Sequence, residues 1–340
     1  MAQDTNRSIN SIGVLVGLDL IGDALIKLPF IRALRTAFPQ AEISWITTQG
    51  KSFFSGPLRE LSRPYLDHVL EQPEFLAEPD KAAPRYDILI DTRNRWRMAR
   101  EARRIPHEVF IAPAMRYLFS DRRPLMFWHK QPHIRDRLLE LVRLAAGRMP
   151  EVAGGIPVPE SYRAKAAAAL PEGPVYAGLV PGAGNKVKIW PRERFVELAA
   201  RQQAAGRVPA FLIGPQETEW LAELQAAVPS AKFPLQDPVW GGAYDLAATM
   251  AVGERLACAV TGDNGTSHML AAVDCPLVSL FGPTNAAKLA PRVSHGKVII
   301  AQQFGGEAMA LIPLDAVARA ADELCGGIGA AIVAAKRAAS

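Results

Sequence analysis

The stretch 256–273 constrains the fold of this chain more than any other. Residues 256–260 form an apolar run with the length of a buried strand, and this run stops at the polar, glycine-rich turn 261–265. An apolar-periodic segment that begins near Thr266 predicts a helix. A strand that feeds a helix through such a turn gathers free backbone N–H groups and the positive end of the helix dipole at one point. That point suits a phosphate group.

The polar residues of this turn are therefore candidates for binding an anionic ligand. The hydroxyl groups of Thr266 and Ser267 would add hydrogen-bond donors there. The alternative is an ordinary strand–helix turn in which side chains of the turn cap the helix. The candidate binding residues of this stretch are Asp263, Asn264, Gly265, Thr266 and His268.

The size and composition of the chain indicate a globular protein of two domains. The chain has 340 residues, which exceeds one typical hydrophobic core. Its hydrophobic content of 49% and charged content of 21% are typical of a soluble protein. A net charge of +5 fits an anionic partner without singling out nucleic acid.

Cysteine usage and the absence of targeting patterns favour a cytoplasmic protein. Cys258, Cys275 and Cys325 are scattered in apolar surroundings, with neither metal-ligand spacing nor an evident disulfide framework. We expect reduced cysteines in the core. Residues 1–10 are polar, so no secretory signal is visible, and no stretch reaches the roughly 18 apolar residues that a membrane helix needs. Any membrane contact is expected to be peripheral.

The first half of the chain alternates between strand and helix patterns. Short apolar runs at 12–16, 43–47, 69–70 and 87–91 predict strands. Apolar residues recur at three- and four-residue spacing from Leu25 to Phe38, which predicts a helix after the first strand. This alternation predicts a parallel α/β sheet.

Asp23 lies where the first strand passes to its helix. In an open α/β sheet, ligands bind at this edge. A carboxylate there is able to accept a proton from a substrate hydroxyl, which would make Asp23 a general base. The alternative is a helix N-cap, a position that Asp also favours.

Residues 93–137 are rich in arginine, poor in acids, and interleaved with aromatic residues such as Trp96, Phe127 and Trp128. Such a segment suits an anionic lipid surface or a phosphorylated or carboxylated acceptor. RNA is a weaker hypothesis because no nucleic-acid-binding motif accompanies the segment. The alternative is a solvated helix face with ordinary loops. The candidate acceptor-binding residues are Arg93, Arg95, Arg122 and Arg123.

Proline and glycine mark residues 149–174 as the best linker candidate, with an alanine-rich helix predicted at 161–170. A second α/β pattern begins with the strand 175–180 and enters the loop 181–188. In this loop, glycines allow close approach of the backbone to a phosphate, and a lysine neutralises charge. The alternative is a surface turn with solvated lysines. The candidate residues are Gly182, Ala183, Gly184 and Lys188.

Two further strands are predicted at 208–214 and 276–281. Glu217, which follows the first of them, is placed to bind ribose hydroxyls. An acid that complements a helix dipole explains Glu217 equally well. The loops 181–188, 214–219 and 262–268 should meet at one sheet edge, with 282–285 beside them, and this convergence favours a ligand site.

Four stretches together resemble glycosyltransferase family 9, the ADP-heptose:lipopolysaccharide heptosyltransferase family. They are IGDALIKLPFIRALRTAFPQAEISWIT (21–47), PGAGNKVKIWPRERFVELA (181–199), LIGPQETE (212–219) and TGDNGTSHMLAAVDCPLVSLFGPTN (261–285). Their order and spacing match the family over roughly residues 12–325. Each stretch alone is weak, but the set is specific.

The resemblance implies an α/β fold of GT-B type, in which two Rossmann-like parallel-sheet domains face a central cleft. The N-terminal acceptor-binding domain would span 1–155, a linker region 156–174, and the nucleotide-sugar (donor) domain 175–340. The resemblance also implies an inverting, metal-independent transfer with no cofactor beyond the nucleotide-sugar co-substrate.

The resemblance assigns roles by position. Asp23 resembles the family's general base, and Lys188 resembles the lysine that binds the donor phosphates. Glu217 is similar to the acid that binds ribose, a place that Gln216 would also fit. Residues 263–268 resemble the loop that holds the diphosphate and the sugar.

We therefore expect a glycosyltransferase that moves a sugar, heptose from ADP-heptose, onto a lipopolysaccharide core acceptor. It would act in the cytoplasm, in peripheral contact with the inner face of the inner membrane and without a nucleic-acid partner. The alternatives are a transferase that uses another nucleotide sugar, a nucleotide-sugar epimerase, and a non-catalytic nucleotide-sugar-binding protein.

Overall fold

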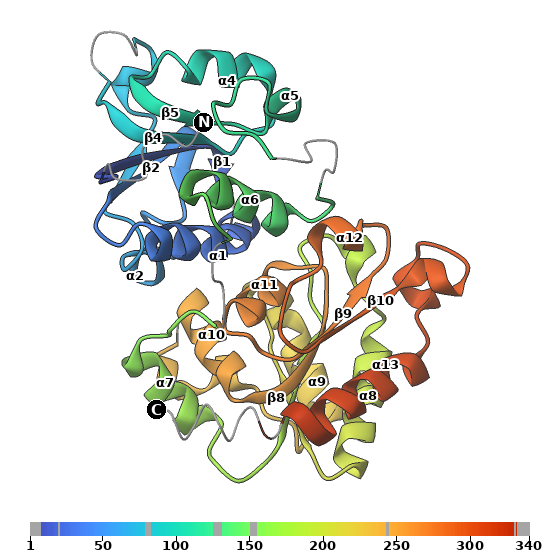
Figure 1. The fold of residues 1–340 in the computed structure, drawn as a ribbon. Helices are drawn as coiled ribbons and strands as arrows, with labels where there is room; N and C mark the ends of the chain where they lie inside the picture. The colour runs from blue at the N-terminus through green and yellow to red at the C-terminus, as the bar shows by residue number, and fades with distance from the viewer. Residues whose placement is uncertain are drawn as a thin grey trace. The chain divides into compact units, whose positions relative to one another are not determined.

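The structure is a computed structural model that describes residues 8–19, 21–78, 83–124, 131–149, 155–242, 245–329 and 331. Phe127 and Trp128 of the arginine-rich segment lie outside the described residues. The contacts divide the chain into two compact units, Met1–Ala153 and Gly154–Ser340. Each unit is built on one five-stranded sheet whose paired strands all run parallel (Figure 1).

The sheet of the first unit has the strand order β3-β2-β1-β4-β5. Its strands are β1 (Ser11–Asp19), β2 (Glu42–Ser52), β3 (His68–Glu71), β4 (Tyr86–Asp91) and β5 (His107–Ile111). The four strands predicted for this half are confirmed, whereas β5 was not predicted. Its helices are α1 (Ile21–Ala37), α2 (Arg59–Ser62), α4 (Trp96–Ala102), α5 (Ala114–Tyr117) and α6 (Ile134–Ala146). Helices α1, α2 and α6 cover one face of the sheet, and α4 and α5 cover the other (Figure 1).

Helix α1 shows how the sequence pattern produces this packing. The apolar positions that predicted the helix, including Leu25, Leu28 and Ile31, are buried, and the helix packs against α6. Pro29 lies inside α1 without ending it. On the opposite face, Leu15 of β1 and Leu89 of β4 join a core cluster with residues of α4.

The sheet of the second unit has the strand order β10-β9-β8-β6-β7. Its strands are β6 (Tyr176–Val180), β7 (Val208–Phe211), β8 (Leu256–Gly262), β9 (Leu277–Phe281) and β10 (Gly296–Ile300). Every residue of β6, β8 and β9 is buried, which explains why these strands are continuous apolar runs in the sequence. Strand β10 was not predicted.

The helices of the second unit include the one predicted after residue 265. They are α7 (Glu160–Ala169), α8 (Arg192–Ala204), α9 (Leu221–Ala227), α10 (Leu246–Glu254), α11 (Gly265–Ala272), α12 (Ala286–Leu289) and α13 (Leu314–Glu323). Helix α7 packs against α10, and the Nε atom of Arg163 lies 2.9 Å from the Oε2 atom of Glu254. The described part of 156–174, expected to form a linker, therefore belongs to the second unit.

The two strand orders determine where ligands are able to bind. Successive connections leave β1 and β4 of the first sheet, and β6 and β8 of the second, in opposite directions. The carboxyl ends of such neighbouring strands leave a crevice, which is where open α/β sheets bind ligands. The expected α/β architecture of two Rossmann-like parallel sheets is confirmed.

The expectation of three reduced cysteines is wrong for two of them. Cys258 of β8 and Cys325 form a disulfide across a sequence separation of 67 residues, and Cys275 is a buried free thiol. Sequence spacing gave no sign of this pair because the fold, rather than proximity in the chain, brings β8 against the segment that follows α13. No helix within the described ranges has the length and apolar character needed to cross a bilayer.

Candidate active site

A partly buried ion pair lies at the carboxyl ends of β6 and β8. Lys188, in the short helical turn Lys186–Lys188 that follows β6, places its Nζ atom 2.7 Å from the Oδ2 atom of Asp263. The Asp263 side chain is 9% exposed and that of Lys188 is 27% exposed. An ammonium group carries three donors, so Lys188 keeps hydrogen-bonding capacity for an anionic ligand beyond the pair with Asp263.

Asn264 joins the two loops and caps the following helix. Its Nδ2 atom donates to the carbonyl oxygen of Gly182 at 2.6 Å, and its Oδ1 atom accepts from the backbone N–H of Ser267 at 2.8 Å. The capping interpretation is therefore correct for Asn264. The same hydrogen bonds fix loop 181–188 beside the N-terminus of α11, where the helix dipole favours negative charge.

The residues at the start of α11 divide into two groups. Gly265, Thr266 and His268 are half-buried. Ser267 is fully buried and donates its hydroxyl hydrogen to the carbonyl oxygen of Asn264 at 2.7 Å, so this hydroxyl serves the helix turn. Of the two hydroxyl groups considered from the sequence, Thr266 is the one in a half-buried position.

Glu217 occupies a space that two glycines leave open. A Cβ atom at Gly182 would lie 2.2 Å from Cδ of Glu217, and one at Gly214 would lie 2.6 Å from its Oε2 atom. Burial raises the pKa of Glu217, although backbone N–H groups at the loop oppose this shift. A buried carboxylate needs donors, and ribose hydroxyls are donors of the right kind.

Exposure separates Glu217 from the alternative, Gln216. Glu217 is 8% exposed and faces loop 181–188, whereas Gln216 is exposed. A Cβ atom at Gly184 would lie 3.8 Å from Oε1 of Gln216, an ordinary contact distance. The backbone of Gly184 is exposed and Ala183 is half-buried, so this part of the loop is open to a ligand.

The loop after β9 contributes a feature that sequence reasoning missed. The hydroxyl oxygen of Thr284 is buried and has no hydrogen-bond partner in the described part of the chain. The neighbouring Gly282 accepts a hydrogen bond at 2.8 Å from the Nε2 atom of Gln302, which follows the unpredicted strand β10. The sequence indicated loop 282–285, but it carries no signal for the burial of a single hydroxyl.

In the first unit, Asp23 and two of the arginines follow neighbouring strands. Asp23 lies in the first turn of α1, directly after β1, and is exposed. Because α1 begins at Ile21, Asp23 is inside the helix and is not its N-cap residue. Arg93 and Arg95 follow β4, which pairs with β1. These three residues therefore belong to the same sheet edge.

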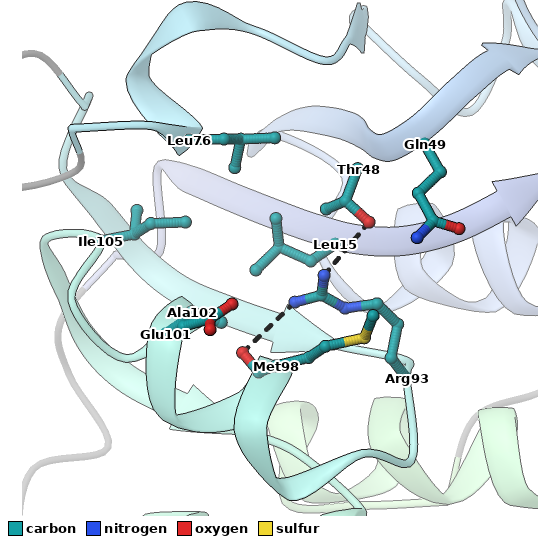
Figure 2. A pocket seen from close by; sticks show the side chains of 9 residues that line it. All are labelled: Leu15, Thr48, Gln49, Leu76, Arg93, Met98, Glu101, Ala102 and Ile105. Atoms are coloured by element: carbon teal, nitrogen blue, oxygen red, sulfur yellow. Dashed lines mark hydrogen bonds between the residues drawn. The ribbon is translucent and has the colours of Figure 1, made fainter.

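Arg93 is held by the buried carboxylate of Asp91. It also lines a pocket of about 240 Å³ (Figure 2). Its Nε atom donates to Oδ1 of Asp91 at 2.7 Å and its Nη2 atom to Oδ2 at 3.0 Å. Its Nη1 atom donates to Oγ1 of Thr48 at 3.1 Å. Burial raises the pKa of Asp91 while Arg93 opposes that rise. The wall of the pocket combines apolar side chains, such as Leu15 and Met98, with polar ones, such as Gln49.

The other candidate acceptor arginines differ in their surroundings. Arg95 is exposed at the N-terminus of α4. Arg122 donates to the carbonyl oxygens of Leu144 and Ala145 at the C-terminal end of α6, at 3.2 and 2.5 Å. Arg123 donates to backbone carbonyl oxygens of residues 118 and 120. Arg122 and Arg123 therefore stabilise the local backbone.

Within the described ranges, no group of three or more His, Cys, Asp or Glu side chains is arranged to hold a metal ion. At the turn after β8, the ammonium group of Lys188 contacts Asp263.

Fold and site together define a class: α/β proteins of two Rossmann-like units, one of which presents a crevice lined by glycine loops, a lysine and a helix N-terminus. The model of glycosyltransferase family 9 (heptosyltransferase) matches residues 82–308. The chain belongs to glycosyltransferase family 9. It is a glycosyltransferase.

Individual relatives are distant in sequence and similar in fold. Lipopolysaccharide heptosyltransferase 1 of Escherichia coli K12 is 22% identical over 304 residues, which cover 80% of this chain and 88% of the relative. The solved family 9 glycosyltransferase of Veillonella parvula has a TM-score of 0.68 at 20% identity, covering 94% of this chain and 98% of that one. The E. coli heptosyltransferase WaaC, solved with ADP, has a TM-score of 0.67 at 20% identity, covering 92% and 99%.

Proposed function

We propose that this glycosyltransferase transfers heptose from ADP-heptose to a lipopolysaccharide core acceptor. The proposal rests on three features that meet at one crevice. They are the Lys188–Asp263 pair, the cradle that Gly182 and Gly214 form around the Glu217 side chain, and the N-terminus of α11. The relatives support the choice of donor, because WaaC has been solved both with ADP and with ADP-2-deoxy-2-fluoro heptose.

In the proposed donor complex, each part of the crevice binds one part of the nucleotide sugar. Lys188 and the backbone N–H groups at the start of α11 would bind the diphosphate. Glu217 would accept hydrogen bonds from the ribose hydroxyls. The loop residues Gly182, Ala183 and Gly184 would let the backbone approach the ligand, and Asp263 to His268 would contact the diphosphate and the sugar.

The reaction is an inverting substitution at the anomeric carbon. An acceptor oxygen forms a bond to that carbon while the bond to the diphosphate oxygen breaks and its electron pair leaves with the diphosphate. Asp23 would take the proton from the acceptor hydroxyl. Lys188 and the helix N-terminus would stabilise the charge that develops on the leaving group.

For the acceptor we propose contacts with Arg93 and Arg95, because both follow β4 at the edge that also carries Asp23. A guanidinium group pairs well with phosphate or carboxylate. Arg93, Arg122 and Arg123 all have hydrogen-bond partners within the first unit. Arg122 and Arg123 are less suited to this role because they follow α5 and not β4. We propose a cytoplasmic enzyme that meets its acceptor at a membrane surface.

The first experiment separates donor binding from chemistry. Thermal stabilisation by ADP and ADP-heptose would be measured against UDP and GDP sugars, because a ligand that binds the native state raises the melting temperature by mass action. Lys188→Ala should abolish the shift. Asp23→Asn should retain the shift and lose at least about 100-fold in turnover with acceptor, as expected for removal of a general base.

Each outcome has a defined meaning. If only UDP or GDP sugars shift the melting temperature, the donor is one of these sugars and not ADP-heptose, and the class of reaction stays the same. No shift with any nucleotide, or the same shift in Lys188→Ala, would overturn the assignment of the crevice. Wild-type turnover in Asp23→Asn would overturn the assignment of the base.

A further inference from the structure

Two short helices of the first unit present large apolar side chains to solvent. Trp96 on α4 is 45% exposed, and Met115 and Leu118, in and after α5, are 57% and 52% exposed. Helices α4 and α5 contact each other and lie side by side on the same face of the sheet (Figure 1). We call the surface formed by Trp96, Arg97, Arg100, Met115 and Leu118 the α4–α5 surface.

The backbone at Met115 has an unusual conformation. Met115, Arg116 and Tyr117 all have left-handed backbone angles, with φ of 48°, 54° and 65°. Such angles are unfavourable for residues with side chains, so the surrounding structure must maintain them. Tyr117 supplies one anchor, because it turns inward, and burial together with the nearby Glu140 raises its pKa to about 12.

A second anchor connects the two helices. Arg103, the residue that follows α4, donates to the carbonyl oxygen of Phe119, and its Nη2 atom lies 2.7 Å from Oδ1 of Asp121. The segment after α5 is thereby fixed to α4. Met115 and Leu118 are therefore exposed in a segment whose position is fixed by contacts with the rest of the unit.

The charge around these apolar residues is strongly positive. Residues 93–124 contain nine arginines and three acids. Two of the acids are paired, Glu108 with Arg85 and Asp121 with Arg103. The third, Glu101, lines the pocket beside Arg93. On the surface itself, Arg100 is exposed, and the guanidinium carbon of Arg97 lies 5.4 Å from the centre of the Trp96 ring.

We propose that the α4–α5 surface docks on an anionic lipid bilayer. Trp and Met side chains bury favourably at the boundary between headgroups and acyl chains, while arginines pair with lipid phosphates. The surface supplies both kinds of contact from neighbouring helices. This inference rests on the proposed function, in which the enzyme meets its acceptor at a membrane surface, and names the part of the chain that makes the contact. Its test uses vesicles that contain neither donor nor acceptor.

The test is cosedimentation of the full chain with vesicles of phosphatidylcholine alone and of phosphatidylcholine with phosphatidylglycerol. Wild-type protein should bind the anionic vesicles, bind the zwitterionic ones far less, and lose binding as salt increases. Arg97→Glu/Arg100→Glu should weaken binding at least about 25-fold, because each arginine near the surface contributes about fivefold. Trp96→Ser/Met115→Ser/Leu118→Ser should weaken it at least about tenfold.

Matched control variants separate this surface from general charge and apolar content. Arg59→Glu/Arg63→Glu makes the same change in charge on exposed residues in and after α2, on the other face of the sheet, and should bind like wild type. Met149→Ser/Val298→Ser removes exposed apolar side chains elsewhere and should also bind like wild type. Thermal unfolding and the ADP-induced shift confirm that each variant is folded.

Three results would overturn the proposal. The first is equal binding of wild type to both kinds of vesicle, or no binding to either. The second is undiminished binding by the variants of the α4–α5 surface. The third is binding of an oligouridylate probe, lost in those variants, without vesicle binding, which would assign the surface to RNA. Because the ADP shift is measured separately, failure of the donor assignment remains distinguishable.

Discussion

Replacement of Gly182 by alanine tests the donor crevice more selectively than removal of a charged group. The new Cβ atom would lie 2.2 Å from Cδ of Glu217, whereas non-bonded carbons approach to about 3.5 Å. The carboxyl group must therefore move by at least about 1 Å out of its cradle. Because it moves toward water, Gly182→Ala should change the melting temperature little.

The effect of Gly182→Ala on nucleotide binding should be much larger. Hydrogen bonds to a charged group contribute about 1.5–3 kcal/mol, so displacement of Glu217 should weaken ADP binding about 10- to 150-fold. Isothermal titration calorimetry with ADP would measure this change. Neither Gly182 nor Gly184 has a left-handed φ, so the substitution adds no backbone strain.

Gly184→Ala is the matched control, because its Cβ atom would lie 3.8 Å from its nearest neighbour, Oε1 of Gln216. It should bind ADP within about twofold of wild type. In the double variant Gly182→Ala/Glu217→Ala, the glycine substitution should add nothing to the loss caused by Glu217→Ala. Equal losses in both glycine variants, or additive losses in the double variant, would refute the role of the cradle.

Three further predictions concern buried charge and sulfur. Burial raises the pKa of Glu217, so the folded state binds the carboxyl proton more tightly than the unfolded state does. The free energy of unfolding therefore falls as the pH rises from the ordinary range of a glutamate through the raised pKa. Glu217→Gln should raise the melting temperature at neutral pH, and an equal gain at pH 3 would contradict this cause. Arg93→Ala leaves the buried Asp91 carboxylate unpaired and should lower the free energy of unfolding by about 3 kcal/mol or more in denaturant titrations, with partial recovery on adding Asp91→Asn. A thiol assay on the unreduced, denatured chain should detect one reactive thiol, that of Cys275, whereas three would show that the disulfide does not form. Reduction of the disulfide should lower the free energy of unfolding by about 4 kcal/mol.

Much of the fold could be predicted from apolar patterns, and the strands that were missed share a physical reason. The helix α1 and the central strands β6, β8 and β9 bury nearly all their apolar positions, so their periodicity is clear. Strands β5 and β10 each form an edge of their sheet and contain exposed residues such as Glu108 and Val298. An edge strand needs no continuous apolar run, and its pattern resembles that of a loop.

The sequence predicted the positions of candidate site residues but not their partners. Glycine-rich turns after strands were enough to bring Lys188 and Asp263 to one edge, because parallel strands end together. The ion pair between these two residues depends on side-chain geometry that no spacing records. Likewise, an arginine-rich composition does not distinguish Arg122, which donates to backbone carbonyls of α6, from the exposed Arg95.

The reversal of strand order at β1/β4 and at β6/β8 places residues that are far apart in the chain on neighbouring strands. Ile12 pairs with Ile88 across β1 and β4, and Tyr176 pairs with Leu256 across β6 and β8, whereas other neighbouring strands join residues much closer in the chain. These two seams therefore carry the largest loop-closure entropy in their sheets. Each candidate ligand edge lies at such a seam. A molecule bound across the seam ties together the chain segments that are most distant in sequence, so occupancy should slow hydrogen exchange most in the paired amides of β6 and β8.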